Sequence, residues 1–512
     1  MNVKLSVVLF AAISMTLPGV APGQGFRGGQ REAFGDRFGA APHVQRAPRR
    51  HGATDAADAM QRLRHWNEIA LDSNALDHTP VAAGETRVFG EELGPTRTSR
   101  ALAIVHIAIF DAINAITGEY QSYTGLAPGP RDADIGAAIA QATHDTLVAL
   151  FPSQAASCDQ LLAEDLKNIP AGRAKVNGVD VGSRAAAAIL ALRANDGSQV
   201  AEARVGIDFI TSNDPGKWRQ DPISQIPLAY GSHWGGVTPF VIVSGAQFRA
   251  APPPALTSPE YTEAFNEVKR LGGDGVVTST QRTLAQTIAA LYWAYDGTAG
   301  LGTPPRLYNQ IAVAIADQKH LRVAELARLL ALVNVAMADV GIAAWETKYY
   351  YQFWRPVTAI READQGTGPT GAGDGNPATI GDPTFTPLGA PASNLMGPNF
   401  TPPFPAYVSG HAAFGAALFQ TLRNFFRTDG IAFTFVSDEL NGVTRDNNQN
   451  VRPLIPRRFA SLSEAEEENG QSRIYLGIHW AFDKTEGIAQ GRHVADYVFR
   501  RAFVPRREPS DR

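Results

Sequence analysis

The stretch that decides the fold is LRVAELARLLALVNVAMADVGIAAWETKYYYQFW, which runs from residue 321 to residue 354. Its apolar residues follow the period of an α-helix, with no strand-like alternation between apolar and polar positions. Its C-terminal part is apolar nearly all the way round, which is typical of a helix that is buried on every side. The stretch therefore predicts one long helix in the core of a helical protein.

Further stretches carry apolar residues at helical spacing or are rich in alanine, a strong helix former. They cover residues 100–116, 134–151, 180–193, 279–299, 306–316, 412–426 and 492–502. Long alternating patterns of the kind found in strands are absent, and only a short β piece is expected near 239–243. We predict an all-α fold of two helical bundles packed together. The N-terminal helical domain would cover 53–275, and the C-terminal helical domain, which holds the candidate site below, would cover 276–505.

Two long segments rich in glycine and proline interrupt this helical pattern, at 211–254 and at 364–405. Irregular segments of this length inside a compact domain are usually functional or disordered. The second one leads directly into a segment that carries reactive side chains, which favours a functional role for it.

The composition is that of an ordinary globular protein, with 44% hydrophobic and 19% charged residues among 512. The formal net charge of −4 argues against a nucleic acid or a charged membrane surface as the partner of the whole molecule. The single cysteine, Cys158, cannot form a disulfide within the chain. Any attraction for an anion must therefore come from a local cluster of charges.

The N-terminus has the pattern of an export signal. Lys4 precedes a short apolar run over 5–17, and small residues follow the run. We predict a signal peptide over 1–23 and a secreted or periplasmic protein, with a membrane anchor as the alternative. Residues 24–52, rich in Gly, Arg, Gln and Pro, predict a disordered segment. No later stretch reaches the about 18 uncharged apolar residues of a membrane helix, so no span is expected after removal of the signal.

Lys348 and Arg355 are the first residues that point to chemistry. They are seven apart, so on one continuous helix they would lie within about 20° of the same face. Two long cationic side chains on one face can converge on a single anion. Most of their neighbours are aromatic, which favours a buried anionic partner over a solvated basic face. Pro356 predicts that the helix ends just after Arg355.

The second segment is Ser409-Gly410-His411, which directly precedes a helical stretch. Ser409 stands where a helix N-cap belongs, and its hydroxyl can cap the first turn. Gly410 lets the backbone approach a ligand closely, and unpaired N–H groups at a helix start favour anions. His411 would then lie beside the bound anion. An ordinary helix cap with an incidental histidine is the alternative.

The third segment contains Arg473, Gly477, His479 and Asp483. On one uninterrupted helix Arg473 and His479 would point about 120° apart. Gly477 can end the helix between them, so that both side chains face one point. Asp483 lies four residues after His479, so on a helix its carboxylate could orient the imidazole. A cap or a surface charge is the alternative for Asp483.

Together the three segments supply three cations, one hydroxyl, one exposed amide and two histidines. This set suits a tetrahedral, phosphate-like oxyanion, with one histidine as its axial ligand or as a nucleophile and the other as an acid or base. The helices of a bundle can bring such distant segments together. Spacing alone leaves phosphate and vanadate open.

The order Lys-x6-Arg-Pro, Ser-Gly-His and Ser-Arg-x3-Gly-x-His begins at Lys348, Ser409 and Ser472. It resembles the superfamily of vanadium haloperoxidases and type 2 phosphatidic acid phosphatases. Within that superfamily the chain is most similar to the vanadium chloroperoxidases, over about 88–503. Other segments that look like their counterparts there are 292–297, 302–306 and 402–407. One departure is Val408, where the family usually has proline; this affects the rigidity of the turn and removes no ligand.

The resemblance implies how vanadate would be held, one per chain. His479 would bind vanadium axially, and His411 would contact the apical oxygen and act as general acid and base. The residues that would hold the vanadate are Lys348, Arg355, Ser409, Gly410 (through its N–H), Arg473 and His479. Asp296 would pair with Arg473 behind the site.

The resemblance also implies a halide side of the pocket, lined by Trp345 and Phe404. Algal bromoperoxidases usually have histidine at the position of Phe404, so the phenylalanine favours the chloroperoxidase type. The implied activity is the oxidation of bromide, and of chloride, by hydrogen peroxide to hypohalous acid, which halogenates small organic acceptors. Lys348 would polarise the oxygen that the halide attacks.

Two alternatives remain open at this point. An acid phosphatase on the same scaffold would use His479 as its nucleophile and His411 as the proton donor. A catalytically silent helical protein would keep the three segments without a reaction.

Overall fold

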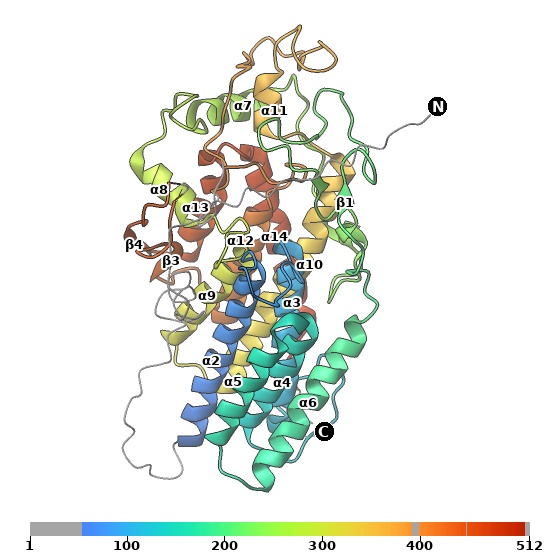
Figure 1. The fold of residues 1–512 in the computed structure, drawn as a ribbon, viewed down its shortest axis with the longest axis vertical. Coiled ribbons are helices and arrows are strands. Elements are labelled where there is room, and N and C mark those ends of the chain that lie inside the picture. The colour runs from blue at the N-terminus through green and yellow to red at the C-terminus, as the bar shows by residue number, and fades with distance from the viewer. Residues whose placement is uncertain (1–53, 392–398, 447, 507–512) are drawn as a thin grey trace. The chain divides into compact units, whose positions relative to one another are not determined.

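The structure is a computed structural model, and we describe residues 54–391, 399–446 and 448–506 of the chain. The predicted signal peptide over 1–23 and the predicted disordered segment over 24–52 lie outside these residues. The described chain is mainly helical, with thirteen α-helices and two small antiparallel sheets of two strands each (Figure 1). This confirms the all-α prediction.

The helices are α2 (Thr54–Asp77), α3 (Pro95–Thr117), α4 (Ile135–Leu150), α5 (Ala155–Lys167), α6 (Arg173–Arg193), α7 (Pro259–Leu271), α8 (Leu284–Tyr292), α9 (Pro304–Asp317), α10 (Val323–Tyr351), α11 (Pro356–Arg361), α12 (Gly410–Phe426), α13 (Leu462–Tyr475) and α14 (Ala481–Arg501). The strands are β1 (Ala203–Arg204), β2 (Leu228–Ala229), β3 (Phe433–Asn441) and β4 (Leu454–Phe459). β1 pairs with β2, and β3 pairs with β4.

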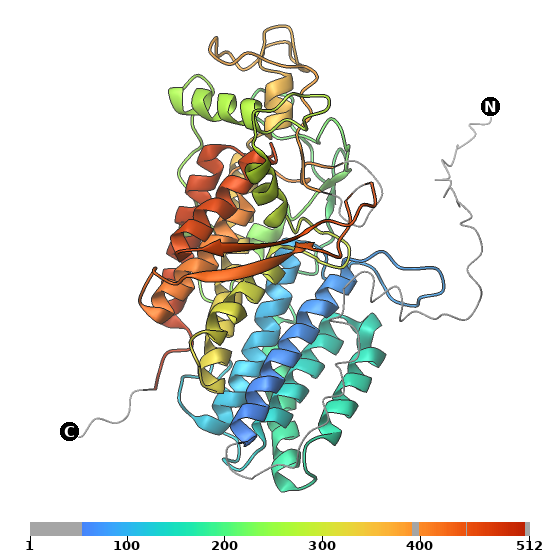
Figure 2. The ribbon, with the colours of Figure 1, turned by 90° about the vertical axis from the view of Figure 1, so that its left-hand side faces the viewer.

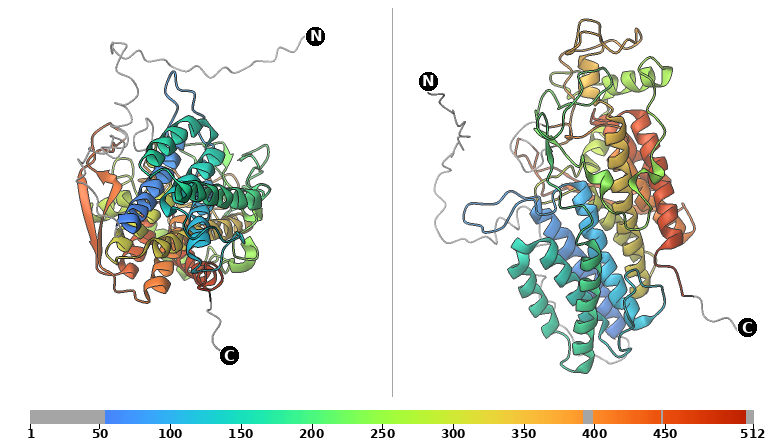
Figure 3. Two further views of the ribbon diagram at one scale, coloured as in Figure 1. Left: turned by 90° about the horizontal axis from the view of Figure 1, so that it is seen from below. Right: turned by 90° about the vertical axis from the view of Figure 1, so that its right-hand side faces the viewer.

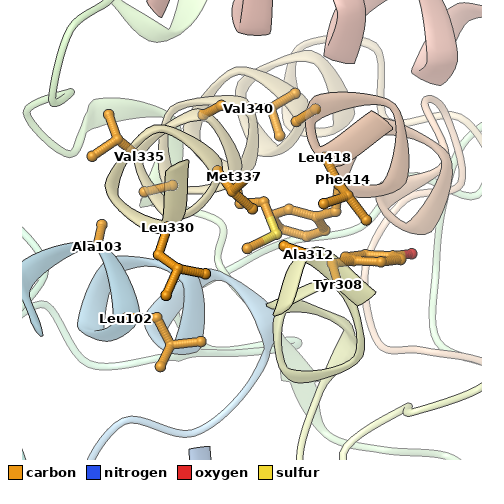
Figure 4. Close-up of a cluster of buried hydrophobic side chains, with 14 of the residues drawn as sticks. Leu102, Ala103, Tyr308, Ala312, Leu330, Val335, Met337, Val340, Phe414 and Leu418 are labelled. Carbon is orange, nitrogen blue, oxygen red and sulfur yellow. The ribbon is translucent and has the colours of Figure 1, made fainter. Parts of the chain in front are cut away.

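The long helix α10 forms the centre of the core. It has 29 residues and is buried over most of its length, as its sequence predicts. It packs against α3, α9, α12 and α14. Figure 4 shows Leu330 of α10 against Leu102 of α3, and Met337 of α10 against Phe414 of α12.

Two groups of helices pack around α10. Helices α2 to α6 contact one another in the first group, drawn from blue to green, and α12 to α14 contact one another in the second, drawn in orange and red (Figures 1 and 3). The β3–β4 hairpin lies beside α8 and α9, along one side of the second group (Figure 2). The division into domains at residue 275 stays a prediction.

Two helices of the described chain, α3 and α10, are long and apolar enough to cross a membrane, although the sequence pointed to none. In each of them 94% of the most apolar window is buried inside the fold. Both helices therefore serve as core helices here.

The short β piece predicted near 239–243 does not form a strand. The carboxylate of Asp339 in α10 instead accepts the backbone N–H groups of Phe240, Val241 and Ile242, at 2.6, 2.8 and 2.9 Å. The prediction was wrong because a buried side chain, and not a neighbouring strand, satisfies this backbone.

The helix predicted over 279–299 is shorter, since α8 covers only Leu284–Tyr292. A capping box of Thr283 and Gln286 starts it, and the left-handed backbone of Tyr295 follows its end. The β3–β4 hairpin was not predicted, because its strands carry many polar and charged residues and no clear alternation. The predicted stretches also did not include the helices α2, α5, α7, α11 and α13.

His106 in α3 makes the stability of this core sensitive to acid. The side chain is buried, its Nε2 lies 3.1 Å from Nδ2 of Asn309, and its Nδ1 has no hydrogen-bond partner among the described residues. Burial lowers the pKa of His106 to about 3, whereas in the unfolded chain the pKa is the usual 6.5. The unfolded chain therefore binds the extra proton first as the pH falls.

We expect the free energy of unfolding to drop by up to about 5 kcal/mol between pH 6.5 and pH 3 because of this one group. The contribution is fully present above pH 6.5 and is lost below it. In His106→Leu, the free energy of unfolding should fall less steeply between pH 6.5 and pH 3 than in the parent protein. Chemical denaturation at each pH measures this free energy. Parallel pH curves for the two proteins would contradict the prediction.

Candidate active site

The three segments singled out in the sequence meet in one pocket of about 270 Å³. Gly410, His411, Arg473 and His479 line it, together with Asp296. Other members of the predicted set lie next to the pocket and are buried as well: Lys348, Arg355 and Ser409. The fold therefore brings the predicted residues together, although the backbone between them follows a different path from the one that the spacing predicted.

Lys348 and Arg355 converge through a turn and not along one helix face. Helix α10 ends at Tyr351, and Gln352 adopts the left-handed conformation of a C-cap, with its N–H donating to the carbonyl of Lys348 at 2.8 Å. Arg355 is extended and forms the N-cap position of α11. The prediction of one continuous helix was wrong because Pro356 begins the next helix and does not end the first.

Lys348 uses all of its ammonium donors on the backbone that leads into Ser409. Its Nζ lies 3.0 Å from the carbonyl oxygens of Pro405 and Ala406, and it also donates to the carbonyl of Val408. An ammonium group has three donors, so the lysine fixes this turn to α10. The predicted bond from Lys348 to an oxyanion would require Nζ to release one of these carbonyls.

Ser409 and Gly410 form the start of α12, as predicted. The Ser409 hydroxyl accepts the N–H of Ala412 at 3.4 Å, and its own hydrogen stays available for another acceptor. A Cβ on Gly410 would lie 3.3 Å from the Trp345 ring, closer than most real Cβ contacts. The glycine therefore lets the helix start approach the pocket wall, and the unpaired N–H groups of the first turn favour an anion there.

His479 lies between α13 and α14 because Gly477 turns the chain. Gly477 has a φ of +74°, and a Cβ there would lie 2.5 Å from the carbonyl oxygen of Gly272. Asp483, in the first turn of α14, accepts the N–H of Trp480 at 3.1 Å and lies 2.8 Å from Nδ1 of His479. Asp483 thus orients the imidazole from the first turn of α14. His479 lies before that helix begins, so the two residues do not share one helix as predicted.

These contacts define the form of the His479 ring. With a proton on Nδ1 for Asp483, Nε2 carries a lone pair, which lies 2.9 Å from Nη1 of Arg355. Burial, and then the charges of Arg355 and Lys348, hold the pKa of His479 well below its usual range. The ring is therefore neutral at neutral pH, and Nε2 is suited to bind an electrophilic centre.

Arg473 and Arg355 present buried donors without acceptors. Nη2 of Arg473 donates to both carboxylate oxygens of Asp296, at 2.7 and 2.8 Å. Nε and Nη1 of Arg473, and Nη2 of Arg355, have no partner among the described residues. Buried guanidinium donors are almost always satisfied, so an oxyanion is the kind of group that this pocket lacks.

His411 completes the site from the first turn of α12. Its Nε2 lies 2.6 Å from the carbonyl oxygen of Ala294, so Nε2 carries the proton and Nδ1 is an acceptor. Burial, and then the charge of Arg473, lower the pKa of His411 well below its usual range. An anion in the pocket would offset the cations and make protonation of this ring easier.

The chain is 32% identical over 504 residues to the vanadium chloroperoxidase of Curvularia inaequalis, covering 82% of this chain and 78% of that protein. The chain belongs to the vanadium haloperoxidase family. The family model described as the VCPO second helical-bundle domain matches residues 328–506, which include the three segments of the site.

Solved structures share the fold of this haloperoxidase family member. A bacterial vanadium-dependent iodoperoxidase superposes with a TM-score of 0.65 at 22% identity, over 90% of this chain and 99% of that one. A holo-type bacterial vanadium-dependent chloroperoxidase superposes with a TM-score of 0.58 at 16% identity, over 84% and 95%.

In this haloperoxidase family member, Trp345 and Phe404 line the same pocket with their ring centroids 4.9 Å apart. Sequence reasoning missed a third aromatic residue, Tyr230, whose ring lies 6.1 Å from Trp345 and 5.9 Å from Phe404. Tyr230 belongs to the glycine- and proline-rich segment 211–254, whose unusual length was its only signal.

Sequence reasoning also missed the support behind Asp296. Glu439 of β3 accepts the N–H of Tyr295 at 3.0 Å and the hydroxyl of Thr298 at 3.3 Å, and it pairs with Arg452. The β3–β4 hairpin therefore fixes the short segment that supplies both Asp296 and the Ala294 carbonyl that meets His411.

Loss of the Glu439 carboxylate should weaken anion binding in the pocket, although Glu439 does not line the pocket. We expect Glu439→Ala to lower the affinity for inorganic phosphate by about tenfold, the lower end of what loss of a direct partner of a metal ligand costs, because Glu439 acts one contact further away. Glu439→Gln keeps an oxygen acceptor for the Tyr295 N–H and should retain most of the affinity. Calorimetric titration with phosphate measures both variants, and equal affinities for Glu439→Ala and the parent protein would contradict the argument.

Proposed function

We propose that this protein is a vanadate-dependent haloperoxidase that oxidises halide ions with hydrogen peroxide and halogenates small organic acceptors. Hydrogen peroxide, a halide ion and a proton give hypohalous acid and water. The halide loses two electrons, and the O–O bond of the peroxide is reduced. The membership of the family supports this reaction, and the relatives named above are chloroperoxidases and an iodoperoxidase.

The observation that carries the proposal is the combination of unsatisfied guanidinium donors with an imidazole lone pair. Nε and Nη1 of Arg473 and Nη2 of Arg355 need an oxyanion, and Nε2 of His479 can bind the atom at its centre. Vanadate offers both a negatively charged set of oxygens and a Lewis-acidic metal. The residues that would hold it are Arg355, Ser409, Gly410, Arg473 and His479, with Lys348 beside them. We propose that this pocket holds one vanadate per chain.

Each residue would have a distinct task. When bound, vanadate would supply the Lewis-acid chemistry that activates hydrogen peroxide. Asp483 keeps the proton on Nδ1 of His479, and Asp296 fixes the direction of Arg473. The two arginines balance the charge of the anion. His411 would take up and return a proton at Nδ1, because its Nε2 is bound to Ala294.

For the halide we propose bromide and chloride, because Trp345 and Phe404 give this side of the pocket two apolar rings next to cations. Nζ of Lys348 lies 5.1 Å from the Phe404 centroid, and Cζ of Arg355 lies 4.9 Å from it. Export to the periplasm or the medium is part of the proposal and is supported by the sequence pattern around Lys4 alone.

The test is to load the purified protein with orthovanadate and to follow oxidation of chloride, bromide and iodide by hydrogen peroxide. The same preparation, without vanadate, is offered p-nitrophenyl phosphate. We expect vanadate-dependent oxidation of bromide and chloride and no turnover of the ester. Hydrolysis of the ester without halide oxidation would instead establish the acid phosphatase, with His479 as its nucleophile. Failure of the protein to bind vanadate would favour a catalytically silent protein.

A further inference from the structure

The pocket has an outer part that the halide reaction does not require. Its wall is made of apolar side chains that are partly or largely exposed, and we call this set the vestibule: Phe89, Leu93, Ile226, Leu228, Phe400 and Pro403. They come from three separate segments of the chain, and none of them is charged. Phe89 is 45% exposed, which places it at the rim.

The acidic, basic and histidine side chains that line the same pocket are all buried. They are His78, Asp296, His411, Arg473 and His479. His78 is already satisfied, since its Nδ1 lies 2.8 Å from the carbonyl of Asn74 and its Nε2 accepts the N–H of Gly94 at 2.8 Å. The pocket therefore has a charged floor for an oxyanion, and the side chains of the vestibule offer an ionic molecule no group of opposite charge.

The wall between floor and rim is fixed before anything binds. The Tyr230 hydroxyl forms a hydrogen bond of 2.7 Å with the hydroxyl of Thr96. The backbone carbonyl of Tyr230 accepts hydrogen bonds from Trp345 Nε1 at 3.2 Å and from the Tyr349 hydroxyl at 2.8 Å. A Cβ on Gly94 would lie 2.3 Å from the Tyr230 hydroxyl oxygen. Because these rings are already held in place, little conformational freedom is lost when an apolar molecule enters.

The volume indicates how large that molecule is. An apolar cavity of about 150 Å³ takes up one benzene ring. The whole pocket measures about 270 Å³, so it has room for one ring beside an oxyanion on its floor. A charged acceptor would have to give up its hydration against walls without a partner, which is strongly unfavourable.

We propose that the vestibule binds the organic acceptor, and that this acceptor is an uncharged, single-ring aromatic compound of the phenol class. This inference rests on the proposed function. The halogen is transferred inside the pocket: a carbon–halogen bond forms on the ring, the ring carbon loses its proton, and the hydroxyl of the hypohalous acid leaves as water. The enzyme therefore selects its acceptor and does not only release hypohalous acid into solution.

The experiment is a competition between p-cresol and 4-hydroxybenzoate, two phenols that differ at one position in a methyl group and a carboxylate. The vanadate-loaded protein receives both, with bromide and limiting hydrogen peroxide, and the ratio of brominated products is compared with that from reagent hypobromous acid. Because burial of the carboxylate is costly, we expect the enzyme to enrich brominated p-cresol by about tenfold or more over the reagent.

Two adjacent residues of one exposed loop give a matched pair of variants. Phe89→Ala removes the ring at the rim, and Val88→Ala shortens a residue that is 54% exposed and does not line the pocket. We expect Phe89→Ala to lower the enrichment, and the affinity for p-cresol in calorimetry without peroxide, by about threefold, because it removes apolar contact area. Val88→Ala should change neither quantity.

The failures are distinguishable. If neither phenol is brominated, the proposed function is overturned and this inference falls with it. If both are brominated in the ratio that reagent hypobromous acid gives, the haloperoxidase stands and acceptor binding in the vestibule is overturned. Equal effects of Phe89→Ala and Val88→Ala would also overturn it.

Discussion

His479→Ala should abolish vanadate-dependent halide oxidation while leaving a weakened anion site in a folded protein. The change removes the lone pair at Nε2 and leaves the guanidinium groups of Arg355 and Arg473 in place. We expect vanadate affinity to fall by more than the about 10- to 100-fold that follows loss of a partner behind a metal ligand. Phosphate, which the cations alone can hold, should lose much less affinity.

The control is His493→Ala, which removes an exposed histidine from α14, the helix that His479 precedes. It should bind vanadate and phosphate as the parent protein does. Calorimetric titration with both anions, together with bromide oxidation, gives the comparison. If His479→Ala loses vanadate and phosphate to the same degree, the histidine contributes only to the shape of the pocket, and its role as the ligand would have to be abandoned.

The second large effect is expected at the buried pair of Arg473 and Asp296. Asp296→Asn leaves the buried guanidinium of Arg473 without its counter-charge, so in the absence of an anion we expect a loss of about 3–5 kcal/mol in the free energy of unfolding. Adding Arg473→Met to this variant removes the uncompensated charge and should restore most of the stability. The oxidation of bromide should remain lost in the double variant, because the anion site is incomplete.

Chemical denaturation of the parent, both single variants and the double variant, without phosphate or vanadate, gives the coupling between the two residues. Phosphate should stabilise Asp296→Asn more than it stabilises the parent protein, since the anion supplies the missing charge. If the double variant is destabilised by the sum of the two single effects, the pair is not coupled and the argument fails.

Several of the long helices and the site residues named above could be predicted from the sequence, because both depend on local pattern. Helix α2 was not predicted, although it has 24 residues. Helix α10 follows from its apolar period, and Ser409 and Gly477 follow from the chemistry of helix ends. The geometry between segments does not follow in this way. The left-handed Gln352 that separates Lys348 from Arg355 has no signature of its own in the sequence.

Contacts between residues that lie far apart in the sequence could not be predicted either. Nothing near Glu439 indicates that its carboxylate will hold Tyr295, because the two residues are 144 positions apart and α9 to α12 lie between them in the chain. Tyr230 reaches Trp345 from a segment whose sequence predicts only irregular structure. Both contacts are tertiary, and neither a local period nor a short motif encodes them.

The three carbonyls that Lys348 binds have a consequence for how this protein can change in evolution. They fasten the chain just before α12 to the end of α10, so the position of Ser409 depends on an ammonium group and not on the length of the preceding segment. Surface segments whose ends are held tolerate insertions at little cost. The mostly exposed stretch 364–372 can therefore lengthen, shorten or change its composition while the helix start that faces the oxyanion stays where it is.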